Sequence, residues 1–145
     1  MDQLKEIEEI KQLKARYFRF LDTKNWFELG ACLMENVVFS YPPQKIEVNG
    51  RVALIENFST RHAKTKTAHT GSMPEILFND NWHAEGIWFM SDYVVAFDEN
   101  GETKVNHGFG HYHETYTCEH GKWKIQSILL ERLLSTHPTA TIENL

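Results

Sequence analysis

Side chains that can exchange protons or bind anions lie within or beside apolar stretches of this chain. They are Tyr17, Asp22, His69, Asp92 and Arg132. Phenol, carboxyl and imidazole groups are common general acids and bases in enzymes, and a guanidinium binds carboxylates and other anions. If the fold gathers these residues, their types predict proton transfer on a small organic substrate.

An amphipathic pattern at the start of the chain places the first two of these residues on or near a helix. Its apolar side chains recur at spacings of three and four residues: Leu4, Ile7, Ile10, Leu13, Tyr17 and Leu21. The pattern predicts a helix of about five turns. Tyr17 is either a core tyrosine or a phenol that reaches a pocket. Asp22 lies about 140° around an ideal helix from Tyr17, so it is either a turn residue at the helix end or a second pocket group.

Two charged residues interrupt apolar strands later in the chain. Asp92 lies in the strand-like segment 87–95 and shares its period-two face with Trp88 and Met90. Arg132 has the same position on the inner face of the last predicted strand. A charge on an inner face needs a partner, so each is half of an internal ion pair or a group that binds substrate.

Histidines are frequent, with eight in 145 residues, but their positions predict different things. His69 precedes a Thr-Gly-Ser segment at the expected entry to the sheet, where it is structural, exposed or a general base. His107, His111 and His113 share one face of a strand and could hold a metal ion. No carboxylate motif completes that set, so we expect surface histidines and no metal site.

Composition and charge exclude several function classes. Hydrophobic residues are 41% and charged residues 24% of the chain, which is typical of a globular protein. The formal charge is -5 and the basic residues are scattered, so we expect neither nucleic acid nor a membrane as partner. Cys32 and Cys118 are too few for a disulfide framework, and no segment is apolar enough to span a bilayer. We therefore expect a cytoplasmic protein with reduced thiols.

The elements that position these residues fall into helices first and strands after. We expect helices at 4–21, 26–34 and 51–61, and strands at 37–41, 74–78, 82–97, 104–119 and 122–134. Segregated helices and strands predict an α+β class in one domain, residues 1–145. Three N-terminal helices on a curved mixed or antiparallel sheet would make a cone-shaped barrel with a small-molecule pocket inside.

Two motifs carry a family resemblance. Residues 10–22 read Ile-Lys-Gln-Leu-Lys-Ala-Arg-Tyr-Phe-Arg-Phe-Leu-Asp, and residues 69–76 have the pattern His-x-Gly-x-x-Pro-Glu-Ile. Together with Tyr41, a Gly-x-Trp at 86–88, Asp92, Tyr112 and Arg132, they resemble SnoaL-like proteins of the nuclear transport factor 2 superfamily. The motif likeness is strongest to the bile-acid 7α-dehydratase branch, and the chain is also similar to scytalone dehydratase.

The resemblance implies a cofactor-independent dehydratase, a lyase, that acts on a small hydrophobic hydroxy-carbonyl substrate of steroid or polyketide type. It implies catalytic roles for Tyr17, Asp22, His69 and Asp92, and substrate-binding roles for Arg132, Tyr41, Trp88, Met90 and Tyr112. His69 would take the proton next to the carbonyl, an aspartate would hold the imidazole, and Tyr17 would hydrogen-bond the enolate. A homo-oligomer is also implied, with a trimer preferred and a dimer as the alternative.

Two other functions remain open at this point. The same enolate leads to isomerisation or cyclisation, and the fold itself does not choose among these reactions. The superfamily also contains non-catalytic modules that bind small ligands. His111, His113 and the Pro-Pro-Gln segment after Tyr41 differ from the bile-acid branch, which leaves the substrate open while the acid–base set is complete.

Overall fold

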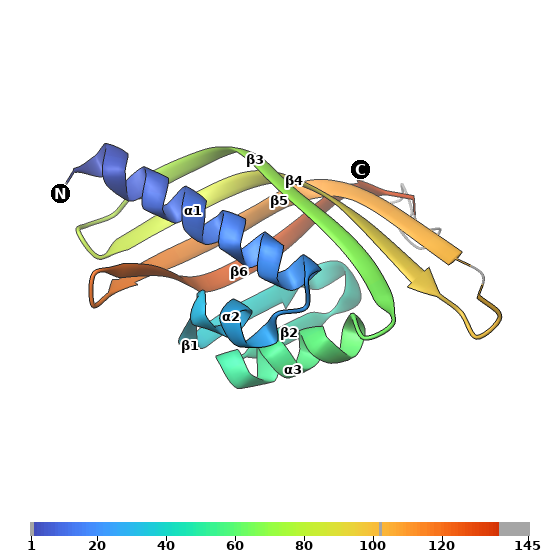
Figure 1. Ribbon diagram of the computed structural model, residues 1–145. Helices are drawn as coiled ribbons and strands as arrows, with labels where there is room; N and C mark the ends of the chain where they lie inside the picture. The colour runs from blue at the N-terminus through green and yellow to red at the C-terminus, as the bar shows by residue number, and fades with distance from the viewer. Residues whose placement is uncertain (1, 102, 137–145) are drawn as a thin grey trace.

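The computed structural model describes residues 2–101 and 103–136, which form helices packed on one mixed sheet (Figure 1). The elements in chain order are α1 (Gln3–Asp22), α2 (Trp26–Ala31), β1 (Leu33–Tyr41), the 3-10 helix η1 (Pro42–Gln44), β2 (Ile46–Asn49), α3 (Arg51–Arg61), β3 (Thr65–Phe78), β4 (His83–Phe97), β5 (Thr103–Glu119) and β6 (Lys122–Ser135). The expected domain span of 1–145 extends beyond these described residues.

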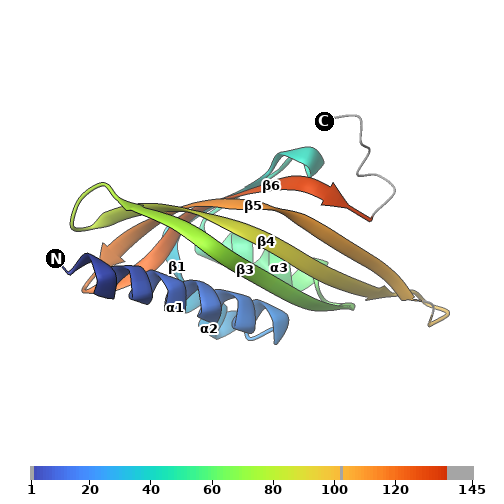
Figure 2. The same ribbon diagram turned by 90° about the horizontal axis from the view of Figure 1, so that it is seen from above.

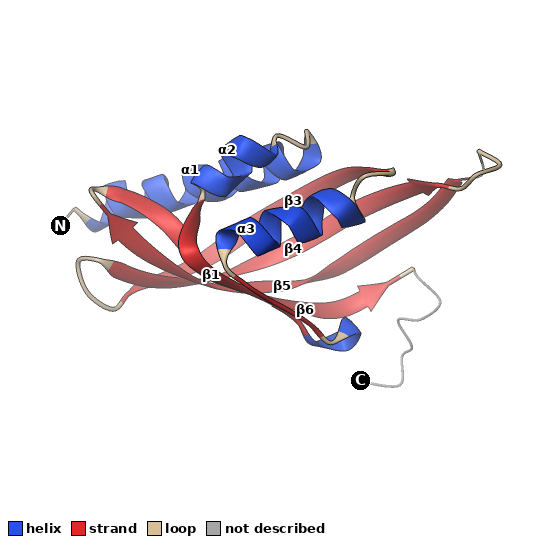
Figure 3. Ribbon diagram, turned by 90° about the horizontal axis from the view of Figure 1, so that it is seen from below, coloured by secondary structure: helices blue, strands red, loops and turns tan. Residues whose placement is uncertain are grey.

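The sheet has the strand order β2-β1-β6-β5-β4-β3. All neighbouring strands are antiparallel except β1 and β6, which are parallel. Figures 2 and 3 show the curved sheet with the helices packed on one of its faces. The α+β class and the three helices on a curved mixed sheet are confirmed. The sheet itself is open between its β2 and β3 edges, so the helices, not a closed strand ladder, complete the cone.

Several elements differ from the sequence-based expectation, among them β1, which begins at Leu33 and not at residue 37. The second helix ends at Ala31 and not at Met34, because the chain turns at Cys32 and pairs Leu33 with Ile125 of β6. Strand β3 begins at Thr65, long before the expected start at residue 74, since its polar and small residues pair with β4 along their whole length. Strand β2 was not expected at all; it pairs four residues with β1.

Four of the six residues in the predicted apolar stripe of α1 enter the core, whereas Leu4 is exposed and Ile7 is half-buried. Ile10, Leu13, Tyr17 and Leu21 are all buried, and α1 packs against β3 and β6. The helix begins at a cap formed by Asp2, whose side chain accepts from the backbone N–H of Lys5. Its stripe faces the sheet as the spacing predicts, and this carries the C-terminal end of α1 onto β3.

Neither a membrane-crossing helix nor a disulfide is found among the described residues. No helix in the described part of the chain is long and apolar enough to cross a lipid bilayer. Cys32 is buried, Cys118 is partly buried, and both are free thiols.

Candidate active site

A cavity of about 210 Å³ lies between the helices and the inner face of the sheet. Its lining includes six of the nine predicted site residues: Tyr17, Tyr41, His69, Asp92, Tyr112 and Arg132. The other three, Asp22, Trp88 and Met90, are not part of the lining. The structure therefore brings together residues that are up to 115 positions apart in the sequence, between Tyr17 and Arg132.

Asp22 lies directly behind His69 and fixes its imidazole. Oδ1 of Asp22 is 2.6 Å from Nδ1 of His69, and Oδ2 accepts the backbone N–H of His69 at 2.9 Å. The hydroxyl of Thr67 donates to the same carboxylate at 2.8 Å. A carboxylate only accepts hydrogen bonds, so Nδ1 carries the hydrogen and the neutral ring has its basic nitrogen at Nε2.

The position of Asp22 follows from the end of α1. The helix stops at this residue, and its side chain reaches β3 while Tyr17 lies on the wall of the cavity. Burial acts to raise the pKa of the Asp22 carboxyl, but the hydrogen bonds from His69 and Thr67 outweigh it and hold that pKa below its ordinary value. Asp22 is therefore an ionised acceptor for the Nδ1–H of His69, although it does not line the cavity.

Asp92 stands opposite His69 on the neighbouring strand and forms an internal ion pair, one of the two alternatives predicted for it. The two residues are direct partners in the β3–β4 register. Arg132 binds Asp92 with both nitrogens, Nη1 to Oδ1 at 2.8 Å and Nη2 to Oδ2 at 2.6 Å. Burial acts to lower the pKa of Arg132, but the hydrogen bonds and charge of Asp92 raise it above its ordinary value.

The second nitrogen of His69 lies on the side of the ring that faces Asp92. Nε2 lies 3.9 Å from Oδ2 of Asp92, beyond hydrogen-bond distance, and both residues line the cavity. A neutral Nε2 gains nothing from this carboxylate, whereas the imidazolium formed by proton uptake is attracted to it. Nε2 therefore lies beside a carboxylate of the cavity wall without a hydrogen bond to it.

Two phenols complete the polar wall of the cavity. Tyr17 and Tyr112 are buried and line the cavity. Burial raises the pKa of both hydroxyls well above the ordinary tyrosine value, so they remain protonated donors. Neither hydroxyl donates a hydrogen bond to, or accepts one from, a residue within 2–101 or 103–136. Each is therefore free to donate to a ligand in the cavity.

The remaining predicted residues support the wall without forming it. The indole N–H of Trp88 donates to the hydroxyl of Tyr116 at 2.8 Å, and neither residue lines the cavity. Met90 lies under the guanidinium of Arg132, with Nη1 3.6 Å from Sδ. The sequence pattern placed both on the inner face of β4, which is right, but strand parity alone does not separate a cavity wall from the layer behind it.

Sequence reasoning missed a buried ion pair beside this site. The ammonium of Lys14 contacts the carboxylate of Glu114, and both side chains are fully buried. Signals for both were present, since Lys14 lies on the apolar stripe of α1 and Glu114 on the inner face of β5 with Tyr112 and Tyr116. A charge at a core position predicts a partner charge elsewhere in the core.

Phe18 and the rim of the cavity were also missed. The Phe18 ring stacks on the His69 imidazole, at 6.1 Å between ring centres and 8° between planes. Gly71 makes room for it, because a Cβ there would lie 2.6 Å from the Phe18 ring. At the rim, Arg61 donates to Gln44 at 3.2 Å, and His62 is half-buried beside them.

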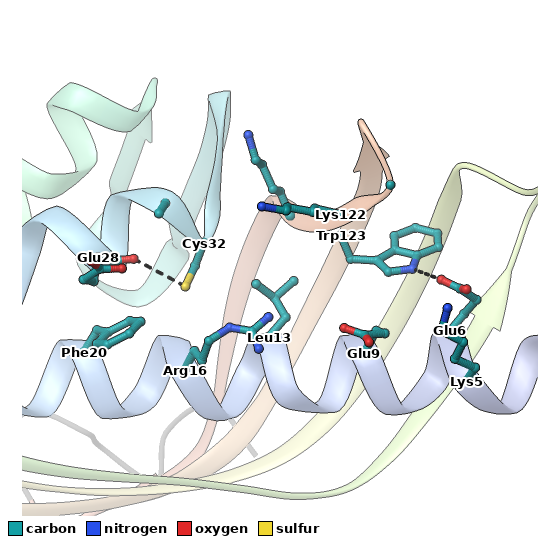
Figure 4. Close-up of a pocket in the computed structure, with 13 residues that line it drawn as sticks. Lys5, Glu6, Glu9, Leu13, Arg16, Phe20, Glu28, Cys32, Lys122 and Trp123 are labelled. Carbon is teal, nitrogen blue, oxygen red and sulfur yellow. Dashed lines mark hydrogen bonds between the residues drawn. The ribbon is translucent and has the colours of Figure 1, made fainter.

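A larger cavity of about 460 Å³ is lined by residues of α1, the end of α2 and the start of β6 (Figure 4). Figure 4 shows its mixed charges, with Glu6 accepting from the indole of Trp123 and Arg16 rising from α1. None of the nine predicted site residues lines it. By volume alone, the larger cavity would be the candidate active site. We choose the smaller one because His69, Asp92 and two free phenols converge there.

The histidines of β5 do not form a metal centre. His107 stacks on Tyr93 with 3.8 Å between ring centres, and Nε2 of His113 lies 2.9 Å from a carboxylate oxygen of Glu131. In the described part of the chain no three histidine, cysteine or acidic side chains come together as a metal ligand set.

Comparison with known proteins places this site in a family. A model of the SnoaL-like domain matches residues 2–128, nearly the whole described chain. The chain belongs to the SnoaL-like family. The fold and the motifs quoted above lead to the same assignment, so the expected resemblance is confirmed.

Solved structures share the SnoaL-like fold at low sequence identity. A candidate scytalone dehydratase from Novosphingobium aromaticivorans is 23% identical with a TM-score of 0.85, over 92% of this chain and 88% of the other. A hexachlorocyclohexane dehydrochlorinase, LinA type 2, is 14% identical with a TM-score of 0.82, over 93% and 90%. ActVI-ORFA from Streptomyces coelicolor is 12% identical with a TM-score of 0.73, over 88% and 96%. These likenesses establish the fold.

Proposed function

We propose that this SnoaL-like protein is a lyase that removes water from a small hydroxy-carbonyl compound, with His69 as the general base. One observation carries the proposal: the imidazole of His69 has Asp22 on Nδ1 and leaves Nε2 for the cavity. A histidine held in the fold through one ring nitrogen can use the other on a ligand in the cavity. The names of similar structures, a dehydratase and a dehydrochlorinase, support an elimination because both names describe loss of a small molecule.

The side chains of the cavity supply each step of such an elimination. Nε2 of His69 takes the proton from the carbon next to the carbonyl, and the C–H electron pair forms an enolate. The phenols of Tyr17 and Tyr112 donate hydrogen bonds to the enolate oxygen. The enolate then expels the β-hydroxyl, which leaves as water with the proton from Nε2, and His69 returns to its neutral form.

Asp92 and Arg132 take different parts in this proposal. Asp92 stabilises the imidazolium across the 3.9 Å gap, and Arg132 holds Asp92 in place with two hydrogen bonds. Asp92 accepts one hydrogen bond from each terminal nitrogen of the guanidinium, so in this proposal Arg132 acts first by holding that carboxylate. This makes Asp92 a catalytic residue and Arg132 its support.

The size of the cavity restricts the substrate class. About 210 Å³ is below the roughly 300–1,000 Å³ usual for drug-sized ligands. A compact one- or two-ring hydroxy ketone, of polyketide-fragment type, therefore suits the cavity better than a complete steroid. Tyr41, Val94 and Leu130 would contact its apolar part.

The test uses a panel of β-hydroxy ketones in D2O, with product and deuterium exchange followed by NMR. Wild type should release the enone, and His69→Ala should lose both elimination and exchange at the α carbon. His83→Ala is the matched control, since His83 forms a similar pair with Asp80 on the surface and should not matter. Exchange without elimination would indicate isomerisation or cyclisation. Elimination at the wild-type rate in His69→Ala would exclude the assignment.

We further propose that the chain forms a homo-oligomer, a trimer in preference to a dimer, through the sheet face that carries no helix. That face exposes large apolar side chains: Ile87, Tyr93, Val105, Leu129 and Leu134. Contiguous exposed apolar surface commonly marks an interface. Sedimentation should give a multiple of the chain mass that Leu129→Lys reduces. Phe27→Lys, at an exposed residue of α2, should leave it unchanged.

A further inference from the structure

The buried pair of Lys14 and Glu114 is not used by the proposed elimination. It connects α1 to β5, and the exposed fraction of each side chain is 1% or less. A buried ion pair is often no more stabilising than apolar residues of the same volume, because both charges lose their hydration. Its presence beside a catalytic cavity therefore calls for a role beyond holding helix to sheet.

Three aromatic rings surround the Lys14 ammonium. Nζ lies 4.0 Å from the ring centre of Tyr112, 4.3 Å from that of Tyr17 and 4.5 Å from that of Phe18. A cation over an aromatic face is attracted to the ring, and more strongly where water is excluded. All three rings belong to the active site, since Tyr17 and Tyr112 line the cavity and Phe18 stacks on His69.

The anionic end of the pair is fixed on the sheet. Glu114 accepts the hydroxyl of Tyr116 at 2.6 Å, and that hydroxyl accepts the indole N–H of Trp88 at 2.8 Å. The carboxylate therefore cannot follow the lysine if the helix moves. Glu114 sets where the ammonium lies, and the ammonium sets where the rings lie.

The phenols need such an external constraint. Their hydroxyls receive no hydrogen bond within residues 2–101 and 103–136, so contacts to the rings alone decide where they point. An oxyanion site works only when its donors are held in place before the charge develops. A shared cation that attracts both ring faces supplies that constraint.

We propose that Lys14 is a positioning residue that holds Tyr17 and Tyr112 as the oxyanion-binding pair of the cavity, with Glu114 fixing the lysine. This rests on the proposed function, because an oxyanion arises there only if the reaction passes through an enolate. Neither Lys14 nor Glu114 touches the substrate, and both act through the tyrosines.

The variants are chosen so that the chain still folds. Lys14→Met alone leaves Glu114 buried without its counter-charge, so the informative variant is Lys14→Met/Glu114→Gln, whose amide oxygen still accepts from Tyr116. Lys14→Arg keeps the cation and is the conservative rescue. Lys124→Met is the matched control, because it breaks an ion pair with Glu119 outside the cavity.

The first measurement reads the position of the phenols without any substrate. In protein labelled with 3-fluorotyrosine, the resonances of Tyr17 and Tyr112 are assigned with Tyr→Phe variants. We expect narrow single resonances in wild type and Lys124→Met, shifted and broadened ones in the double variant, and recovery in Lys14→Arg. Unchanged resonances in the folded double variant would overturn the proposal.

The second measurement reads oxyanion binding with 4-nitrophenol, whose anion absorbs visible light, and with nitrobenzene as the neutral control. The double variant should bind nitrophenolate about tenfold more weakly with unchanged nitrobenzene binding. Tyr17→Phe should weaken nitrophenolate binding by about tenfold in wild type but by less than about twofold in the double variant, because coupled residues are not additive. Equal losses in both backgrounds would refute the positioning role. Wild type that binds no nitrophenolate would count against the proposed function, whereas the fluorine resonances still decide the role of Lys14.

Discussion

The carboxylate of Asp22 binds His69 at two points, its backbone N–H at 2.9 Å and its Nδ1 at 2.6 Å. Asp22 is the last residue of α1 and His69 lies within β3, so one side chain joins helix to sheet and sets the orientation of the imidazole. The hydrogen bond from the backbone N–H holds the carboxylate of Asp22 in position against the imidazole. This double contact makes the proposed chemistry testable at Asp22 as well as at His69.

Asp22→Asn should lower the turnover number by about 10²–10⁴-fold with little change in KM. The amide can donate to Nδ1, which favours the tautomer with its hydrogen on Nε2 and removes the base from the cavity. Steady-state kinetics on a β-hydroxy ketone that wild type converts would measure this, with circular dichroism to verify folding. Thr67→Val removes only the hydroxyl that donates to the same carboxylate and should cost less than about tenfold. Wild-type turnover in Asp22→Asn would mean that the tautomer is not set by this residue.

His62 should make the protein less stable in mild acid. Burial lowers the pKa of His62 to about 4, helped by the charges of His69, Arg61 and Lys24 and opposed by Asp22. In the unfolded chain the pKa of a histidine is about 6.5. Between this value and the folded value of about 4, the unfolded chain therefore binds a proton that the folded chain does not bind. The free energy of unfolding should therefore be unaffected by this group above pH 6.5 and fall as the pH drops from there toward 4.

Urea unfolding at pH 7.5 and 5 measures the effect of His62. His62→Gln cannot take up the proton and should lose less stability between the two pH values than wild type does. His120→Asn, in an exposed turn with φ of 51°, is the control, since asparagine tolerates that backbone conformation. Parallel losses in wild type and His62→Gln would place the acid sensitivity elsewhere.

The periodicity of apolar residues in the sequence is enough to predict the helix layer and the sheet layer of this fold. The spacing of Ile10, Leu13, Tyr17 and Leu21 predicts a buried helical stripe, and the long strands with hairpin turns predict the β4–β6 meander. What periodicity does not contain is pairing at a distance. The parallel contact of β1 with β6 and the short strand β2 depend on partners far along the chain, and β3 begins in residues too polar to look like a strand.

For the candidate site, too, the sequence predicts which residues take part but not how their atoms pair. Ionisable residues in apolar patterns identify Tyr17, His69, Asp92 and Arg132 as candidates, and these line one cavity. Which atom faces which partner is not in the pattern: the sequence predicts that Asp92 and Arg132 each bind a partner charge or the substrate, but not that two parallel hydrogen bonds join them. The burial of Lys14 was not predicted, because a lysine in a helix normally faces solvent. Its position on the apolar stripe of α1 was the signal that it is buried.

Gly108→Ala should disturb the pair of Asp92 and Arg132. A Cβ at this position would overlap Nη1 of Arg132 and lie 3.2 Å from Oδ1 of Asp92. We expect a loss of about 1–3 kcal/mol in the free energy of unfolding, as for other overpacked sites, together with reduced turnover. Gly30→Ala in α2 is the control, because the atom nearest to a Cβ there, Cδ of Arg51 in α3, is 3.8 Å away and alanine favours a helix. Denaturant unfolding of both variants should give opposite signs; a neutral Gly108→Ala would show that the guanidinium can move aside freely.

Lys14→Met should be much more destabilising than the double change Lys14→Met/Glu114→Gln. The single variant leaves a carboxylate in the core with only the Tyr116 hydroxyl as partner, and breaking a buried pair in this way typically costs about 3–5 kcal/mol. Burial already lowers the pKa of Lys14 against the raising effect of Glu114, which shows how strongly desolvation opposes charge at this position. The double variant removes both charges and should regain more than half of the loss. Urea unfolding of wild type, both single variants and the double variant gives the coupling energy directly. Additive losses would show that water reaches the pair and that its two charges are stabilised separately.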